Sequence, residues 1–97
     1  MLPDGTTVTE GPAILTHIAD AHPATGLSPL PGTAKRARHD RWLAFFHANI
    51  YEGELRQLFP QRYVGDPACA DAAKRAADAY VERHFRIFEE ELREAPY

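Results

Sequence analysis

The sequence has little of the chemistry that marks secreted, membrane or nucleic-acid-binding proteins. Its 97 residues include a single cysteine, so no disulfide can form within the chain. It has no long apolar run and no charged-then-apolar leader, so the pattern favours neither secretion nor a membrane span. The formal net charge of −3 provides no excess of cations for a phosphate backbone or an anionic lipid surface. We therefore expect a cytoplasmic protein with no nucleic-acid or membrane partner.

Proline and glycine divide the first third of the chain into short segments. Residues 1–9 read as two short strands joined by a turn at residues 3–5. Apolar residues then recur at helical spacing over Pro12–Ala21, and a proline soon after ends the pattern. The stretch Pro23–Gly32 is rich in proline and glycine, which predicts a linker between two parts of the chain.

Two long helical patterns follow the linker. They cover Ala34–Phe59 and Pro67–Glu94, and the segment Pro60–Asp66 separates them. The second helix has a well-marked start, because Asp66 is a natural N-cap and Pro67 sits where its missing N–H costs nothing. A connection this short predicts that the two helices are antiparallel neighbours.

Charged residues offer a test of that pairing. Basic side chains gather at the start of the first long helix and acidic ones at the end of the second, where each set opposes its own helix dipole. If the helices are antiparallel neighbours, we expect Arg36 near Glu90 and Glu52 near Lys74. The alternative is two solvated faces that do not interact, because exposed ion pairs contribute only about 0 to 1 kcal/mol.

The stretch TVTEGPAIL places glutamate, glycine and proline directly before the first helical pattern. A helix N-terminus offers unpaired N–H groups and partial positive charge, so the backbone at Gly11 suits a carboxylate, while Pro12 gives up a donor that the helix does not use. Glu10 beside it would complement an ammonium group on the same ligand. One hypothesis is therefore a site for the zwitterionic end of an amino acid. The alternative is an ordinary turn before a helix.

Two stretches together resemble a known family. DGTTVTEGPAILTHIADAHP, residues 4–23, and LSPLPGTAKRARHDRWLAFFHANIYEGELRQLFPQRY, residues 27–63, are similar in order and spacing to bacterial, Beta-like glutathione S-transferases. The resemblance implies a mainly α central fragment of such a protein. Residues 1–23 would be a remnant β-hairpin and one helix from the end of a thioredoxin-like, glutathione-binding domain, and 24–33 the interdomain linker. Residues 34–97 would begin the all-α C-terminal domain with a long antiparallel α-hairpin.

The resemblance also implies a ligand and roles for two residues. Glu10 would contact the γ-glutamyl amine of glutathione, and Gly11 would bind the γ-glutamyl carboxylate. Many members have serine at the position of Gly11, so this chain keeps the backbone donor and lacks the hydroxyl. Glutathione would be a co-substrate with a small electrophile, no further cofactor would be needed, and the complete protein would be a homodimer.

The same alignment points to candidates for the electrophile cleft. Some bacterial relatives have a His-Lys pair where this chain has Tyr51 and Glu52, which is a departure from the family pattern. Phe46, Asn49 and Tyr51 would lie on the cleft side of the helix. The alternative is that these three residues pack in a core or are satisfied locally.

Catalytic residues are not predicted in this chain. The residue that activates the thiol in the family, and the cis-proline that precedes its third strand, have no counterpart here, so conjugation is expected only in a complete parent protein. The alternative function is a non-catalytic helical interaction module that keeps the transferase scaffold. No metal site is expected, because His17 and His22 point apart on a helix, and Cys69 reads as structural.

Overall fold

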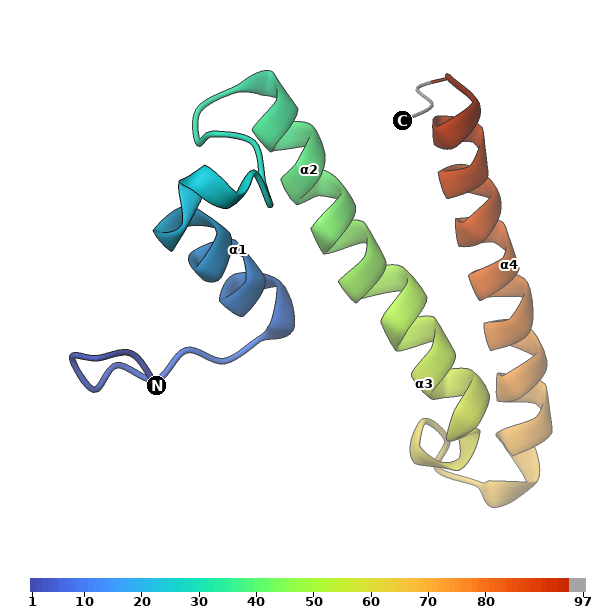
Figure 1. The fold of residues 1–97 in the computed structure, drawn as a ribbon. Helices are drawn as coiled ribbons and strands as arrows, with labels where there is room; N and C mark the ends of the chain where they lie inside the picture. The colour runs from blue at the N-terminus through green and yellow to red at the C-terminus, as the bar shows by residue number, and fades with distance from the viewer. Residues whose placement is uncertain (95–97) are drawn as a thin grey trace. The chain divides into compact units, whose positions relative to one another are not determined.

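The computed structural model describes residues 1–94, and it is mainly helical (Figure 1). The elements in chain order are α1 (Gly11–Ala21), η1 (Pro23–Thr25), α2 (Ala34–Phe45), η2 (Phe46–Tyr51), α3 (Glu52–Leu58), η3 (Pro60–Arg62), η4 (Pro67–Cys69) and α4 (Ala70–Glu94). The chain forms two compact units, Met1–Ala44 and the residues from Phe45 on. The three-part division into 1–23, 24–33 and 34–97 stays a prediction, and its positions 95–97 lie outside the described residues.

The predicted β-hairpin at the N-terminus is wrong, since residues 1–94 contain no strand. Residues 2–6 form a turn instead, in which the Leu2 amide donates to the Thr6 carbonyl at 2.8 Å and the Gly5 amide donates to Leu2 at 3.0 Å. The Asp4 carboxylate accepts from the Thr6 amide at 2.9 Å, and Gly5 has a φ of +88°. A two-stranded ribbon is marginal without a third strand, so these local bonds prevail.

The first helix is confirmed within one residue of its predicted start. In α1 only Ala19 is buried, so most of the helix is exposed. The linker after it contains the short turn η1, which closes at Gly26 with a φ of +68°. Helix α2 then begins under a hydroxyl cap, because the Thr33 side chain accepts from the Arg36 amide at 3.1 Å.

The first long helical pattern is also confirmed, but its interior is not regular. Every residue from Ala34 to Leu58 is helical, yet η2 is a π-helix between α2 and α3. The Asn49 side chain donates to the Phe45 carbonyl at 3.1 Å. In a regular α-helix that carbonyl would accept from the Asn49 amide, so the side chain replaces a backbone bond at this point.

The predicted start of the last helix is confirmed. The Asp66 carboxylate accepts from the Ala68 amide at 2.9 Å, and Pro67 occupies the first turn. That first turn is the 3₁₀ segment η4, and the α-helical pattern of α4 follows from Ala70. Short 3₁₀ turns are common at helix ends. The predicted helical range from Pro67 is therefore confirmed, with a first turn that is 3₁₀ and not α-helical.

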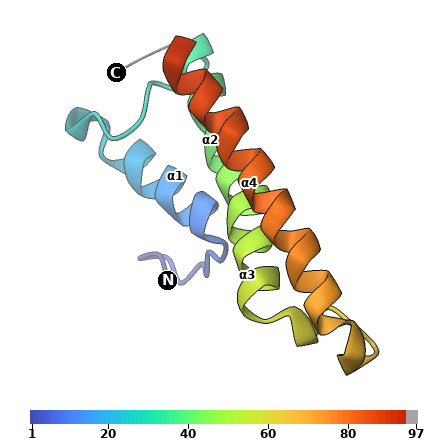
Figure 2. The ribbon, with the colours of Figure 1, turned by 90° about the vertical axis from the view of Figure 1, so that its right-hand side faces the viewer.

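In the second unit, α3 and α4 lie side by side and antiparallel, as Figures 1 and 2 both show. Ile50, Ala77 and Val81 are buried between them and around η2. Gly53 is also buried, and a Cβ at this position would collide with the Val81 side chain. The glycine therefore sets how closely the two helices approach.

The predicted pair of Glu52 with Lys74 is wrong, while the pair of Arg36 with Glu90 joins the two units and stays a prediction. Glu52 pairs with Arg56 at 3.9 Å, and Lys74 pairs with Asp78 at 3.0 Å, each within its own helix. The register explains this result, because the backbone beside Glu52 meets Val81, about two helical turns beyond Lys74. The two 3₁₀ segments η3 and η4 lengthen the connection between α3 and α4. Each residue of α3 therefore lies beside a later residue of α4 than a short connection would give.

Candidate functional site

The Glu10-Gly11-Pro12 segment lies at the head of α1. Gly11 is the first residue of the helix, Pro12 is in its first turn, and the Ile14 amide donates to the Glu10 carbonyl at 3.0 Å. The Glu10 side chain makes no capping hydrogen bond. Gly11 and Ala13 are both exposed at this helix start, and the amides of a first helical turn have no acceptor within the helix itself. The first-turn donors that the sequence predicted are therefore available at the surface.

Glu10 has an unusual backbone conformation. Its φ is +68° and its ψ is +117°, and it is the one non-glycine residue with a positive φ in the part of the chain that the structure describes. Such a conformation costs about 1–3 kcal/mol for a residue with a Cβ and concentrates at functional sites. This conformation occurs at the residue directly before α1, so an acidic residue precedes the exposed helix start.

A groove of about 420 Å³ runs from the start of α1 along one side of the helix. Pro12, Ala13, Thr16 and His17 line it from α1, while α2 contributes Asp40, Leu43 and Ala44. The groove is mainly apolar, with the His17 imidazole and the Asp40 carboxylate as its ionisable groups. A ligand that bound the Gly11 amide would have this groove beside it.

One guanidinium joins three segments of the first unit. The side chain of Arg36, in α2, donates to both carboxylate oxygens of Asp20 in α1, at 2.6 and 3.0 Å. Its Nε donates to both oxygens of Asp40, at 2.8 and 2.9 Å. Its Nη1 also donates to the Pro29 carbonyl in the linker at 3.2 Å. Arg36 is only 7% exposed, whereas its partners Asp20 and Asp40 are partly open to solvent.

The charges in this cluster shift the acidity of its members. Hydrogen bonds from Arg36 lower the pKa of Asp20, and burial opposes them only in part. The pKa of Asp40 is lowered first by its hydrogen bond with His39 and then by Arg36. The two carboxylates in turn raise the pKa of Arg36. The cluster is therefore ionised at neutral pH.

These shifts predict how Asp20 contributes to stability as the pH changes. Because its pKa is lowered on folding, the unfolded chain binds the proton more tightly, and acid favours unfolding. We expect Asp20→Asn to be less stable than wild type above about pH 5, and the difference to shrink as the pH falls below 3.8 through the lower native pKa. Urea unfolding of both proteins over this pH range measures the difference. A difference that stays constant down to about pH 2.5 would contradict the assignment.

The three predicted cleft residues do not gather in one place. Phe46 contacts Phe88 of α4 with ring centroids 4.8 Å apart, and the Asn49 carbonyl oxygen accepts from the Tyr80 hydroxyl at 2.6 Å. Tyr51 is 53% exposed and stacks on the ring of His47, with centroids 5.9 Å apart. Phe46 and Asn49 thus face α4, and Tyr51 lies at the surface. Their roles in a cleft stay predictions.

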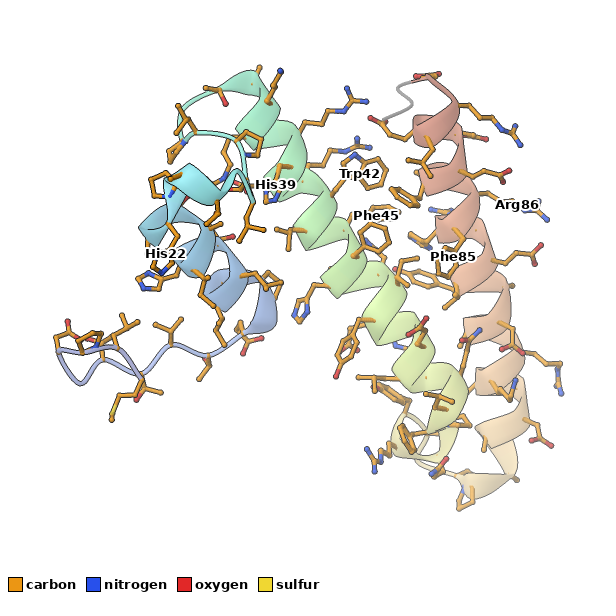
Figure 3. All side chains as sticks on the ribbon, viewed as in Figure 1. His22, His39, Trp42, Phe45, Phe85 and Arg86 are labelled. Carbon is orange, nitrogen blue, oxygen red and sulfur yellow. The ribbon has the colours of Figure 1, made fainter. Side chains whose placement is uncertain are left out.

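Next to Phe46 and Asn49, aromatic rings fill the space between η2 and α4. In the second unit, Figure 3 shows the side chain of Phe45 pointing toward α4. Its ring lies 5.5 Å from that of His84 between centroids. His84 is buried, and its Nδ1 donates to the Tyr80 carbonyl at 2.7 Å, so it is a satisfied core histidine. This arrangement is a core, and it explains why Phe46 is turned inward.

The other residues considered from the sequence add no site. His17 lies within α1 and His22 directly after its end, and in residues 1–94 no three or more histidine, cysteine or acidic side chains are grouped as metal ligands. Cys69 is exposed at the start of α4 and forms no disulfide. Across the same residues, no helix has the length and apolar character needed to cross a bilayer.

The comparison with solved structures found a similar protein. A bacterial GST named BphK, determined as a ternary complex, aligns with 99% of this chain at a TM-score of 0.80 and 32% sequence identity. The chain spans 44% of the length of that protein, so less than half of it has a counterpart here. No protein-family model and no curated protein matches the chain.

Proposed function

From the premise that this chain has the fold of the glutathione S-transferase family, we propose that it supplies part of a glutathione site. In the proposal, Glu10 and Gly11 bind the γ-glutamyl end of the peptide. The complete protein would conjugate the glutathione thiol to a small electrophile. It would act as a homodimer in the cytoplasm, with Phe46, Asn49 and Tyr51 near the electrophile. The similarity to a bacterial GST supports the fold on which this proposal rests.

The geometry at the head of α1 is the single observation that carries the proposal. Gly11 opens the helix, and the acidic residue Glu10 stands directly before it with a positive φ. A ligand carboxylate at the helix start would accept from backbone N–H groups and be favoured by the helix dipole. The ammonium group on the same α-carbon would lie within reach of the Glu10 carboxylate. A γ-glutamyl group has both charges, because its α-carbon bears a carboxylate and an ammonium group.

The groove beside the helix start suits the rest of the peptide. Its apolar lining from Pro12, Ala13, Leu43 and Ala44 would cover the uncharged part of the ligand. Asp40 in the same groove already accepts from Arg36, so its charge is compensated. A groove with this paired acid would therefore repel the free carboxylate of a peptide less strongly than a groove with an unpaired acid.

A variant of Glu10 tests this function. We expect Glu10→Gln to weaken the binding of reduced glutathione by about tenfold, because the amide keeps the size of the side chain and removes the charge that faces the ammonium group. The affinity is measured by titration followed through amide chemical shifts, since we expect only weak binding by this chain. As a matched control, Glu54→Gln removes an exposed acid from α3 in the second unit and should leave the affinity unchanged. Equal affinities for wild type and Glu10→Gln would refute the role of Glu10.

A further inference from the structure

Helix α1 carries the proposed site, yet it has little apolar burial to hold it in place. Ala19 is its one buried residue, while Ile14, Leu15 and Ile18 are 39%, 57% and 45% exposed. The hydrophobic contribution to the position of this helix within the first unit is correspondingly small. Another interaction must fix the helix if its N-terminus is to present a binding site in a defined geometry.

The Arg36 side chain provides such an interaction. It forms a bidentate pair with Asp20, near the C-terminal end of α1, and a second pair with Asp40 on α2. The same guanidinium donates to the Pro29 carbonyl, so the linker is tied at the same point. The planar fork of arginine restricts both distance and angle, which a lysine ammonium at this position would not do.

Asp40 connects this cluster to the proposed site. It accepts from Arg36 and also lines the groove, opposite the α1 residues Pro12 and Ala13 that follow Gly11. The distance between the two walls of the groove therefore depends on how α1 is held against α2 within the first unit. If the pairs of Arg36 were broken, α1 would keep its helical backbone and lose its fixed position.

We propose that Arg36 is a positioning residue for the site at the head of α1. By joining Asp20 to Asp40, it holds α1 at the spacing from α2 that the groove requires. This inference rests on the proposed function for its ligand, and its structural part can be tested without that ligand. Arg36 is not among the residues that line the groove, so its role in the proposal is exerted through the two carboxylates.

A positioning role makes a different prediction from a role in overall stability. Replacing both signs of charge around a buried arginine by neutral groups can leave stability little changed, whereas removing one partner leaves a charge uncompensated. A variant in which the entire cluster is neutral can thus be folded and yet lack the geometric restriction. Such a variant separates the two roles.

The first experiment measures amide hydrogen exchange in the full chain without ligand. In Arg36→Met, we expect the amides of α1 to exchange about tenfold faster than in wild type, while those of α4 remain unchanged. The matched control is Lys74→Met, which removes an exposed cation from the pair with Asp78 and should leave α1 unchanged. Unchanged exchange in α1, or an equal rise in α1 and α4, would overturn the proposal.

The second experiment uses the neutral cluster Asp20→Asn/Arg36→Met/Asp40→Asn. We expect its urea midpoint to be close to that of wild type and its affinity for reduced glutathione to be about tenfold weaker. Wild-type affinity in this folded variant would show that the cluster does not position the site. If wild type itself does not bind glutathione, the proposed function fails, and the exchange experiment alone decides whether Arg36 holds α1.

Discussion

Replacing Gly53 by alanine should lower the free energy of unfolding by about 2 kcal/mol. Alanine is the better helix former by about 1 kcal/mol, so a loss of stability would oppose the local preference. The reason is the collision of the new Cβ with the side chain of Val81, which is β-branched and stiff in a helix. Urea unfolding of the two proteins measures the difference.

Two controls isolate this clash. Gly65→Ala adds the same methyl group in the connection to α4, where no atom lies within 4 Å of the new carbon, and should change stability by less than about 0.5 kcal/mol. In the background Val81→Ala, the penalty at Gly53 should largely disappear, because the colliding methyl groups are gone. An undiminished penalty in that background would show that the close approach of α3 to α4 is not its cause.

Replacing Phe46 by alanine should cost about 2–3 kcal/mol of stability, because the ring packs edge-on against Phe88 of α4. Tyr51→Ala should cost less than about 1 kcal/mol, since that ring is half exposed and stacks only on His47. Thermal or urea unfolding of the two variants gives the comparison. Equal losses would contradict the placement of Phe46 in the core and Tyr51 at the surface.

This pair of variants also bears on the predicted electrophile cleft. A residue that mainly packs in a core affects stability first, and a residue that mainly contacts substrate affects affinity at unchanged stability. Phe46 and Asn49 both contact α4, so we expect substitutions at these positions to lower stability, whether or not they also line a cleft. Tyr51 is the candidate whose substitution can report on a ligand without disturbing the fold.

The helices could be predicted from the sequence because their ends are marked locally. Pro12 starts α1, and Asp66 with Pro67 starts the last helix through the cap that the structure shows. These signals act within one turn, so they do not depend on distant contacts. The helical range from Ala34 can also be predicted from local sequence, because its apolar residues recur at the helical period.

The parts that sequence reasoning missed depend on contacts between distant residues. The strand pattern of residues 6–9 was real as a local preference, but no neighbouring strand is present in residues 1–94 to complete a ladder. The register of α3 on α4 depends on the length of the connection, which its two 3₁₀ segments increase. The π-helix η2 includes a side-chain hydrogen bond from Asn49, and hydrophobic periodicity does not reveal either feature.

Arg36 shows the same limit within the candidate site. Its partner Asp40 lies four positions later, which is the spacing of ion pairs within one helix, although the sequence analysis did not predict this pair. The stronger connection to Asp20 spans the linker and depends on how the first unit folds. The position of Gly11 at the head of α1 was predictable, because glycine and proline alone specify that boundary.

The chemical shift of the Gly11 amide during titration with reduced glutathione tests the central claim most directly. We expect a saturable shift at Gly11 and Ala13 with glutathione, and none with the dipeptide Cys-Gly, which lacks the γ-glutamyl end. That result would place the carboxylate at the start of α1. Equal shifts with both peptides, or no shift at Gly11 at concentrations that saturate other residues, would contradict the account.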